Sequence, residues 1–504
     1  MKLILIKSVK YIFLFSPLLL FLIIFFTRNL ASYGFITSDE TVNYSFASSQ
    51  KKFGVPYFIS ALNTLTQSSI YKPRGTITNQ DKVLSRKFLG YPLIIGSIAR
   101  LFNIEISAIF NAVIFISLFI VIYKIFLELK LKNSLLLSLL VALMPPITYW
   151  TYNYYFENVL GLLFFALGIL FVVKMEMKKK NQTVFTIFSI FFFTLGGYVR
   201  YDYLLFYLPL LIMGLFFFHP KIKQLIIYLL FSIIFLTPLL IINNSLYGHP
   251  LSSGQSSKIE NRSPYVGGGS NISVYPKNLK VVTLALSFHL CFFIVVIYSI
   301  IKDINKPKNE NSKIMFYLSI CTIISFLFFS KFWLAGVPAK ANFYIRDSYV
   351  RYFLPMYFLI FMITSYIVDT YINNKRLFKI AIFLIIIASV LISANQILRD
   401  DRLRSKYIDL AENIINHTES DSIIYIDNMD KVIFPHREIG YLSSDKIKEN
   451  YEEIVDNILT VNQLNRKQYF YLCSLEENNN FLNFALQKGI IFTNIENCLY
   501  LIDM

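Results

Sequence analysis

Long apolar runs, separated by short polar stretches, recur along most of the chain. Eleven of these runs approach the length of about 20 residues that an apolar helix needs to cross the hydrocarbon core of a bilayer. They cover residues 11–26, 106–126, 134–149, 158–173, 184–199, 203–218, 225–242, 281–301, 314–332, 352–371 and 378–394. The pattern therefore predicts an all-α polytopic membrane protein with about eleven transmembrane helices.

The composition agrees with this prediction. Hydrophobic residues make up 55% of the 504 residues, and the mean hydropathy is +0.54. A water-soluble globule of this length could not keep so much apolar surface away from solvent, so soluble classes are excluded. The first run follows a basic lead, as in a signal peptide, but its apolar core is long and lacks a clear cleavage site. We therefore expect an uncleaved first span.

The basic residues of the short loops indicate the orientation. Every second loop is rich in Lys and Arg, namely those near residues 124–132, 174–180, 221–223, 302–313 and 375–379. Loops of this kind remain in the cytoplasm, which predicts a cytoplasmic N-terminus and an extracytoplasmic C-terminal tail. Much of the net charge of +17 is this topological signal, so the charge does not call for a nucleic-acid partner.

Two domains are expected. Residues 1–395 form a transmembrane body with long outer loops at 27–105 and 243–280, and residues 396–504 form a small extracytoplasmic α/β domain. In the tail, strands are predicted at "DSIIYID", "KQYFYLCS", "GIIFTN" and "CLYLIDM", with helices near 443–459 and 476–487. The second outer loop contains "SPYVGGGSNIS", which fits either a lid over a ligand or an ordinary linker.

The four cysteines do not suggest a disulfide framework in so long a chain. Cys291 and Cys321 fall in predicted spans and are interpreted as packing residues. Cys473 and Cys498 lie on two predicted strands of the tail, where either a disulfide or two unpaired core thiols would fit.

Charged residues gather at the outer ends of the predicted spans, whereas the span interiors contain almost none. This distribution argues against an ion-coupled transporter, which needs acids or bases in the middle of the membrane. The outer groups are Asp39, Glu40, Glu157, Arg200, Asp202, Arg346 and Arg351. Together they predict a cavity at headgroup depth, in which cations bind a phosphate or diphosphate and an acid acts on a hydroxyl group.

Each of these residues also has a purely structural interpretation. Asp39 and Glu40 could be solvated acids or cap a loop helix, Glu157 could cap the fourth span, and Arg346 and Arg351 could anchor a span end in anionic headgroups. No second His or Cys lies at metal-ligand spacing from His249, so no zinc site is predicted. No cofactor is certain from the sequence, although a divalent cation held by carboxylates is compatible with it.

Several motifs in a fixed order resemble a known superfamily. They are "SDE" in the first outer loop, "RKFLGYPLIIGSIARLF", "YWTYNYYFEN", "GGYVRYDYLLFYLPLL", "NNSLYGHPLSSGQ" and "RYFLPMYFLI". Their order and sidedness resemble the lipid-linked-sugar glycosyltransferases of the type C fold (GT-C), which include the protein O-mannosyltransferases and the aminoarabinose transferases that modify lipid A. The resemblance covers roughly residues 10–395 and not the tail.

The resemblance implies roles for individual residues. Asp39 would be the general base and Glu40 would support it. Lys87 in "KFLGYP" would contact the carrier phosphate, although Phe88 stands where the family usually has proline. Glu157 would be the second outer-loop acid. Arg200 and Arg351 would correspond to the family's arginines, at the turn between the fifth and sixth spans and at the start of the "RYxLP" span.

The chemistry is consistent with these roles. An inverting displacement needs a carboxylate to accept the acceptor proton and cations to stabilise the departing phosphate. We therefore expect an integral membrane glycosyltransferase that moves a monosaccharide from a polyprenyl-phosphate carrier to a glycan, lipid or protein acceptor outside the cytoplasm. Two alternatives remain: a lipid-linked glycan polymerase, ligase or flippase, and a non-enzymatic membrane scaffold.

Overall fold

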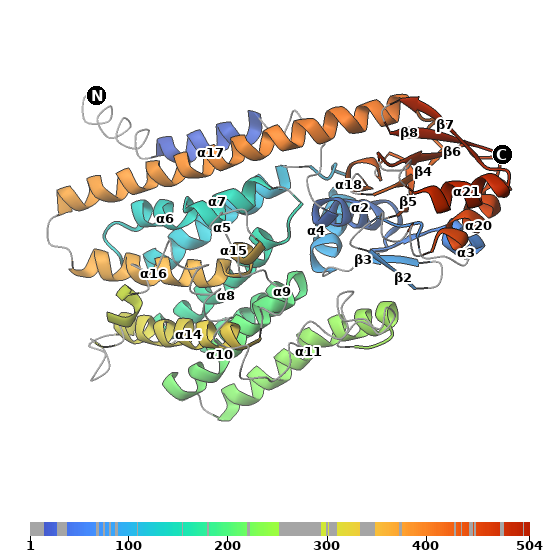
Figure 1. Cartoon of the computed structure of the whole chain (residues 1–504). Helices are drawn as coiled ribbons and strands as arrows, with labels where there is room; N and C mark the ends of the chain where they lie inside the picture. Colours follow the sequence, from blue (N-terminus) through green and yellow to red (C-terminus); the bar gives the residue numbers. More distant parts are fainter. Residues whose placement is uncertain are drawn as a thin grey trace. The chain divides into compact units, whose positions relative to one another are not determined.

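The computed structural model describes residues 15–504 with gaps (Figure 1). The larger gaps fall at 28–37, 251–293, 302–309 and 333–347. Shorter gaps fall at 67–69, 74–75, 80–81, 86–88, 108, 154, 179–180, 219–221, 299–300, 372–374, 428–429, 435, 443–446, 448–449, 474–477 and 497. The Gly-rich stretch of the second outer loop and Cys291 lie outside the described residues, as does most of the predicted span at 281–301.

The chain divides into two compact units. The first is drawn from Met1–Leu30, Ser107–Ile242 and Ser263–Leu398, and the second from Ala31–Ile106, Asn243–Arg262 and Arg399–Met504. The first outer loop, which the sequence analysis placed with the transmembrane body, therefore groups with the C-terminal segment.

The first unit consists of helices. They include the helix Phe15–Thr27, α5 (Ile109–Glu128), α6 (Ser134–Ala142), α7 (Pro145–Tyr152), α8 (Asn158–Met177), α9 (Gln182–Val199), α10 (Tyr201–Phe218), most of α11 (Ile222–Tyr247), α14 (Glu310–Phe332), α15 (Ser348–Tyr352), α16 (Leu354–Tyr371) and the first part of α17 (Lys375–Asn416). Among the described residues, five helices are long and apolar enough to cross a bilayer: Ile109–Glu128, Asn158–Met177, Gln182–Val199, Ile226–Tyr247 and Arg376–Asn416. The chain is thus a multi-pass membrane protein, and the expected count of about eleven spans stays a prediction.

The span predicted at 134–149 is not one straight helix. It consists of α6 and α7, which together pass the same test but are bent by 58°. Pro145 and Pro146 open α7 and explain the break, because proline lacks the backbone N–H of a helix interior and disfavours helical geometry in the residue before it. Met144, just before them, is accordingly extended, with φ −65° and ψ 145°.

Helices α8 and α9 form a close pair. Gly168 permits this approach, because a Cβ built there would lie 2.7 Å from the ring of Phe193. The hydroxyl of Ser189 also donates to the carbonyl of Gly168 at 3.2 Å. The end of α9 consequently lies beside the start of α8, which brings charged residues at these two helix ends together.

The second unit contains a mixed five-stranded sheet. Its strands are β4 (Ile423–Ile426), β5 (Glu438–Tyr441), β6 (Gln468–Tyr471), β7 (Ile491–Glu496) and β8 (Leu499–Asp503), in the order β5-β4-β6-β8-β7. Strand β4 pairs in parallel with β5 and β6, whereas β8 pairs antiparallel with β6 and β7. Four of these strands coincide with the predicted segments, and β5 was not predicted.

Alternation along the strands places apolar side chains on both faces of this sheet. On one face, Tyr425 and Phe470 pack with α20 (Tyr451–Asn462) and α21 (Asn479–Gln487). Three residues of the first outer loop, Leu62, Ile70 and Tyr71, belong to the same core, and α3 (Ala61–Thr66) groups with α20 and α21 (Figure 1). The other face packs against the last part of α17 and α18 (Asp430–Ile433).

The rest of the first outer loop forms a smaller layer. Helix α2 (Ser38–Phe53) packs through Val42 and Phe46 against a three-stranded antiparallel sheet of β1 (Phe58–Ile59), β3 (Lys82–Ser85) and β2 (Thr76–Asn79). Helix α4 (Gly90–Phe102) follows it in the chain and contacts α2.

A disulfide between Cys473 and Cys498 links the end of β6 to the start of β8. The backbone N–H of Leu472 also donates to the carbonyl of Cys498 at 3.0 Å. Of the two arrangements left open by the sequence, the structure therefore shows the bridge. Cys321 is a free, buried thiol, in agreement with a packing role.

Candidate active site

A buried ion cluster forms where α8 begins and α9 ends. The Nη1 of Arg200 donates to Glu157 Oε1 at 3.0 Å and to Asn158 Oδ1, while its Nε donates to Asp202 Oδ1 at 2.9 Å. The Nη2 donates to Asp202 Oδ2 at 3.0 Å. Because the α8–α9 pair is antiparallel, residues far apart in the sequence meet at one end of it. Glu157, Arg200 and Asp202 are thus brought together.

The cluster is almost closed to solvent. The exposed fraction is 1% for Arg200, 2% for Glu157 and 4% for Asp202. A buried ion pair of this kind is stabilising only when its hydrogen bonds are complete, and removing one partner typically costs about 3–5 kcal/mol. Here the guanidinium makes a bidentate contact with Asp202 and further contacts with Glu157 and Asn158. The hydrogen bonds of Arg200 therefore suit a residue that holds the ends of α8 and α9 together.

Arg351 lies against aromatic rings in the same unit. Its guanidinium carbon is 5.6 Å from the Trp150 ring centre and 5.4 Å from that of Phe156. The ring of Tyr352 lies 5.2 Å from Arg351 and 4.7 Å from Arg200, so both guanidinium groups contact one aromatic side chain. Cation–π contacts of this type orient an arginine without neutralising its charge. These rings therefore orient the Arg351 side chain beside the cluster.

Sequence reasoning missed the neighbours that complete this arrangement. Asn158 accepts a hydrogen bond from Arg200, and Tyr352 lies between the two arginines. Each directly follows a predicted site residue in the chain, in "FEN" and "VRY", which is the signal that could have identified them. Trp150 and Phe156 carried no such signal, since a membrane protein has many aromatic residues at span ends.

Asp39 and Glu40 belong to the second unit, in the first turn of α2. Acids are stabilised there by the partial positive charge of a helix N-terminus. Glu40 is 1% exposed and its Oε1 accepts from Nη2 of Arg404, at 3.3 Å. The hydroxyl of Thr41 donates to the carbonyl of Lys431 at 2.5 Å. The two residues that follow Asp39 are thus both tied to the C-terminal segment.

Asp39 itself is 8% exposed. The predicted site residues therefore fall into two sets, with Asp39 and Glu40 in the second unit and Glu157, Arg200, Asp202 and Arg351 in the first. A pocket shared by the two sets stays a prediction. Lys87 and Arg346 lie outside the described residues. Within the described part of the chain, no group of three or more His, Cys, Asp or Glu side chains is arranged to hold a metal ion.

Comparison with known proteins gives the class of fold. No family model and no curated protein matches the sequence. ArnT from Cupriavidus metallidurans, solved with bound undecaprenyl phosphate, has a similar structure with a TM-score of 0.58 over 98% of both chains, at 10% identity. The oligosaccharyltransferase AglB from Archaeoglobus fulgidus, solved with an inhibitory peptide and a dolichol-phosphate, matches with a TM-score of 0.52 at 10% identity, over 97% of this chain and 74% of AglB.

These similarities define a type C glycosyltransferase fold, which confirms the resemblance drawn from the motifs. The match to ArnT also extends the resemblance. The motifs reached only to about residue 395, whereas the structural similarity covers nearly the whole chain, including the tail. At this level of identity the comparison establishes the fold alone.

Proposed function

We propose that the protein is an integral membrane glycosyltransferase that moves a monosaccharide from a polyprenyl-phosphate carrier to an acceptor on the extracytoplasmic face. The observation that carries the proposal is the similarity over 98% of both chains to ArnT, whose structure holds undecaprenyl phosphate. A buried acid pair at the start of α2 and an arginine oriented by aromatic rings, Arg351, provide the chemical groups that such a reaction needs.

In the proposed reaction, Asp39 accepts the proton of an acceptor hydroxyl while that oxygen attacks the anomeric carbon of the donor sugar. The bond from this carbon to the phosphate oxygen breaks, and the polyprenyl phosphate leaves with its electron pair. A single displacement inverts the anomeric configuration. The carboxylate supplies general-base catalysis, and cations stabilise the charge that develops on the phosphate.

The proposed roles of the cations differ. Arg351 contacts the carrier phosphate, since it opens the "RYFLP" motif of the resemblance and the rings of Trp150, Phe156 and Tyr352 orient its guanidinium group. Lys87 and Arg346 are assigned to the same phosphate from their sequence positions. Arg200 already contacts two carboxylates, so we assign Arg200, Asp202 and Glu157 to shaping the substrate site.

The orientation proposed from the basic loops places the tail outside the cytoplasm and the N-terminus inside. The Cys473–Cys498 disulfide supports it, because such bonds persist in oxidising compartments and are rare in the cytosol. A glycan, a lipid or a protein could serve as acceptor, and the tail carries no motif that selects among them. A polymerase, ligase or flippase of lipid-linked glycans is the alternative, since it would bind the same carrier.

Replacement of Asp39 tests the proposal. Asp39→Asn keeps the size of the side chain but removes the base, so transfer should fall at least about 100-fold. The measurement is the release of polyprenyl phosphate from a labelled polyprenyl-phosphate sugar by the purified protein in liposomes, with cell-envelope material as acceptor. Asp456→Asn, at an exposed position of α20, is the matched control and should remain active. Full activity of Asp39→Asn would refute the role of Asp39 as base.

A further inference from the structure

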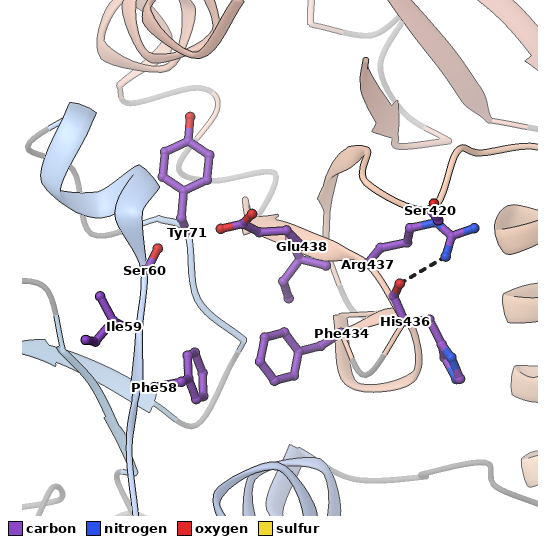
Figure 2. A pocket seen from close by; sticks show the side chains of 10 residues that line it. Phe58, Ile59, Ser60, Tyr71, Ser420, Phe434, His436, Arg437 and Glu438 are labelled. Carbon is purple, nitrogen blue, oxygen red and sulfur yellow. Dashed lines mark hydrogen bonds between the residues drawn. The ribbon is translucent and has the colours of Figure 1, made fainter. Parts of the chain in front are cut away.

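A cleft in the second unit is distinct from the residues assigned to transfer. It has a volume of about 380 Å³ and lies between the first outer loop and the C-terminal segment. Figure 2 shows β1 with Ser60 on one side of it and β5 with Phe434 on the other. This volume is within the range of about 300–1,000 Å³ that is typical of small-molecule sites.

Two aromatic rings form the apolar end of the cleft. Phe58 of β1 and Phe434, which follows α18, lie side by side with ring centres 5.2 Å apart and an angle of 34° between the rings (Figure 2). The ring of Phe58 also packs against the ring of Phe46 in α2, with ring centres 5.2 Å apart. The aromatic pair is thus supported by the core and presents an apolar surface to the cleft.

The polar end of the cleft contains a carboxylate. Glu438 points toward Ser60 and Tyr71 in Figure 2, and its Oε2 accepts from Nη1 of Arg466 at 2.7 Å. Within the described part of the chain this is its only ion pair, so Oε1 can accept a further hydrogen bond. The hydroxyl of Ser60 accepts from the N–H of Asn63 and can still donate.

The backbone of β5 contributes a donor and an acceptor. β5 is an edge strand, and the N–H of Tyr441 donates away from the sheet, to the carbonyl of Ile70 at 2.8 Å. Residues two apart in a strand direct their backbone groups to the same side. The N–H and C=O of Ile439 therefore also point away from β4, and Ile439 lines the cleft.

The cations at the rim do not suit a phosphate. Arg437 uses four of its five N–H groups internally: Nε donates to Thr418 Oγ1, Nη1 to the carbonyl of His436, and Nη2 to the carbonyls of Ile415 and Thr418. Partial burial and the neighbouring Arg437 lower the pKa of His436, so His436 is neutral at pH 7. Among the described residues that line the cleft, Glu438 is a carboxylate and Arg437 is engaged in internal hydrogen bonds, so the cleft disfavours anionic ligands.

We propose that this cleft is a binding subsite for a neutral saccharide. A sugar ring has apolar C–H faces that pack on aromatic rings, and hydroxyl groups that donate and accept hydrogen bonds. The Phe58–Phe434 pair fits the first feature, and Glu438, Ser60 and the Ile439 backbone fit the second. In a glycosyltransferase such a subsite would hold the part of an acceptor or product glycan that does not react. This interpretation extends the proposed function, but binding can be measured without any transfer.

The test measures binding of neutral oligosaccharides to the full-length protein in nanodiscs. The probes are di- and trisaccharides of hexoses and N-acetylhexosamines, detected by saturation-transfer NMR, with a phosphorylated disaccharide and a short peptide for comparison. We expect binding by at least one neutral saccharide. Phe434→Leu and Glu438→Gln should each weaken that binding about tenfold, since each removes a ring face or a charge-assisted hydrogen bond.

Three control variants separate ligand contacts from folding. Phe53→Leu removes a ring that is 63% exposed and lies outside the cleft, and Glu452→Gln removes an exposed acid of α20. Arg466→Gln removes the ion-pair partner of Glu438 but keeps the carboxylate, so all three should retain saccharide binding. Three outcomes would overturn the proposal. One is binding of only the phosphorylated probe or the peptide, and another is saccharide binding by the Phe434 and Glu438 variants that equals that of the unaltered protein. The third is no saccharide binding at millimolar concentration. Saccharide binding by the Asp39→Asn variant separates the subsite from the proposed transfer reaction. We expect this variant to bind saccharide although transfer is lost.

Discussion

The buried ion pair with Arg404 distinguishes Glu40 from its neighbour Asp39. Both partners are nearly closed to solvent, with side-chain exposures of 1% and 2%, and their atoms are 3.3 Å apart. Glu40 is thus occupied by an arginine of the C-terminal segment, which fixes the first turn of α2. Asp39, one residue earlier, is held in position by that turn. In the proposed reaction Glu40 and Arg404 are therefore positioning residues.

Glu40→Gln should destabilise the protein more than an ordinary surface change does. The substitution leaves the charge of Arg404 buried beside a neutral amide, and the loss of one partner of a buried pair typically costs about 3–5 kcal/mol. Thermal unfolding of the protein in detergent measures the effect. Glu419→Gln is the control, because it breaks an ion pair with Lys467 whose side chains are 53% and 55% exposed. Equal unfolding temperatures for the two variants would contradict a structural role of the buried pair.

A positioning role can be separated from stability by kinetics. If Arg404 acts only through α2, Arg404→Lys should keep part of the stability but lower the turnover number more than the apparent affinity for the donor lipid. An unchanged turnover number would show that the pair does not position Asp39. The sequence indicated Asp39 and Glu40 as a pair but could not reveal Arg404, because 364 positions separate Glu40 from it.

At the level of elements, the sequence was most informative where structure is local. Apolar runs predicted α8 and α9, and the helix pair brings together Glu157 at the start of α8 and Arg200 at the end of α9. Strand alternation predicted β4, β6, β7 and β8. The sequence did not predict the bend between α6 and α7. It also did not predict β5, whose four residues include a glycine and a charged side chain. Such short edge strands carry little periodic signal.

The disulfide links strands β6 and β8, and its contribution to stability can be tested. Cys473 and Cys498 are 25 residues apart, and closing a loop of this size stabilises a fold by about 3.5 kcal/mol in the chain-entropy model. Replacing both cysteines by serine should therefore speed hydrogen exchange of β6 and β8 in the full-length protein, measured by mass spectrometry. Cys321→Ser, in the first unit, should leave these strands unchanged. Unaltered exchange in the double variant would mean that the bridge adds no stability.

At the level of the whole molecule, the second unit is assembled from segments that are distant in the sequence. The sequence predicts the tail as a separate domain, because the composition changes abruptly after the last apolar run. The structure places Leu62, Ile70 and Tyr71 of the first outer loop in one core with Tyr425, Phe470 and other tail residues. The hydroxyl groups of Tyr71 and Tyr425 are 3.0 Å apart in this core. Contacts between segments so distant in sequence leave no local pattern, so sequence reasoning could not find them.

A truncated chain that ends at Asn416 should therefore lose the folded structure of the first outer loop as well as the tail. The truncation keeps α17 and Arg404 but removes all five strands of the mixed sheet, so Leu62, Ile70 and Tyr71 would be exposed to water. Burial of an apolar side chain of this size contributes about 1.5–3 kcal/mol, which is enough to unfold a loop that depends on three of them. Limited trypsin digestion with mass spectrometry should then show faster cleavage after Lys51 and Lys52 than in the full-length protein, together with loss of transfer.

Cleavage at Lys178, in the first unit, provides the internal reference and should not change. Retained protection of α2 in the truncated protein would mean that the outer loop folds without the tail, and the tail would then be a separate domain as its composition suggested.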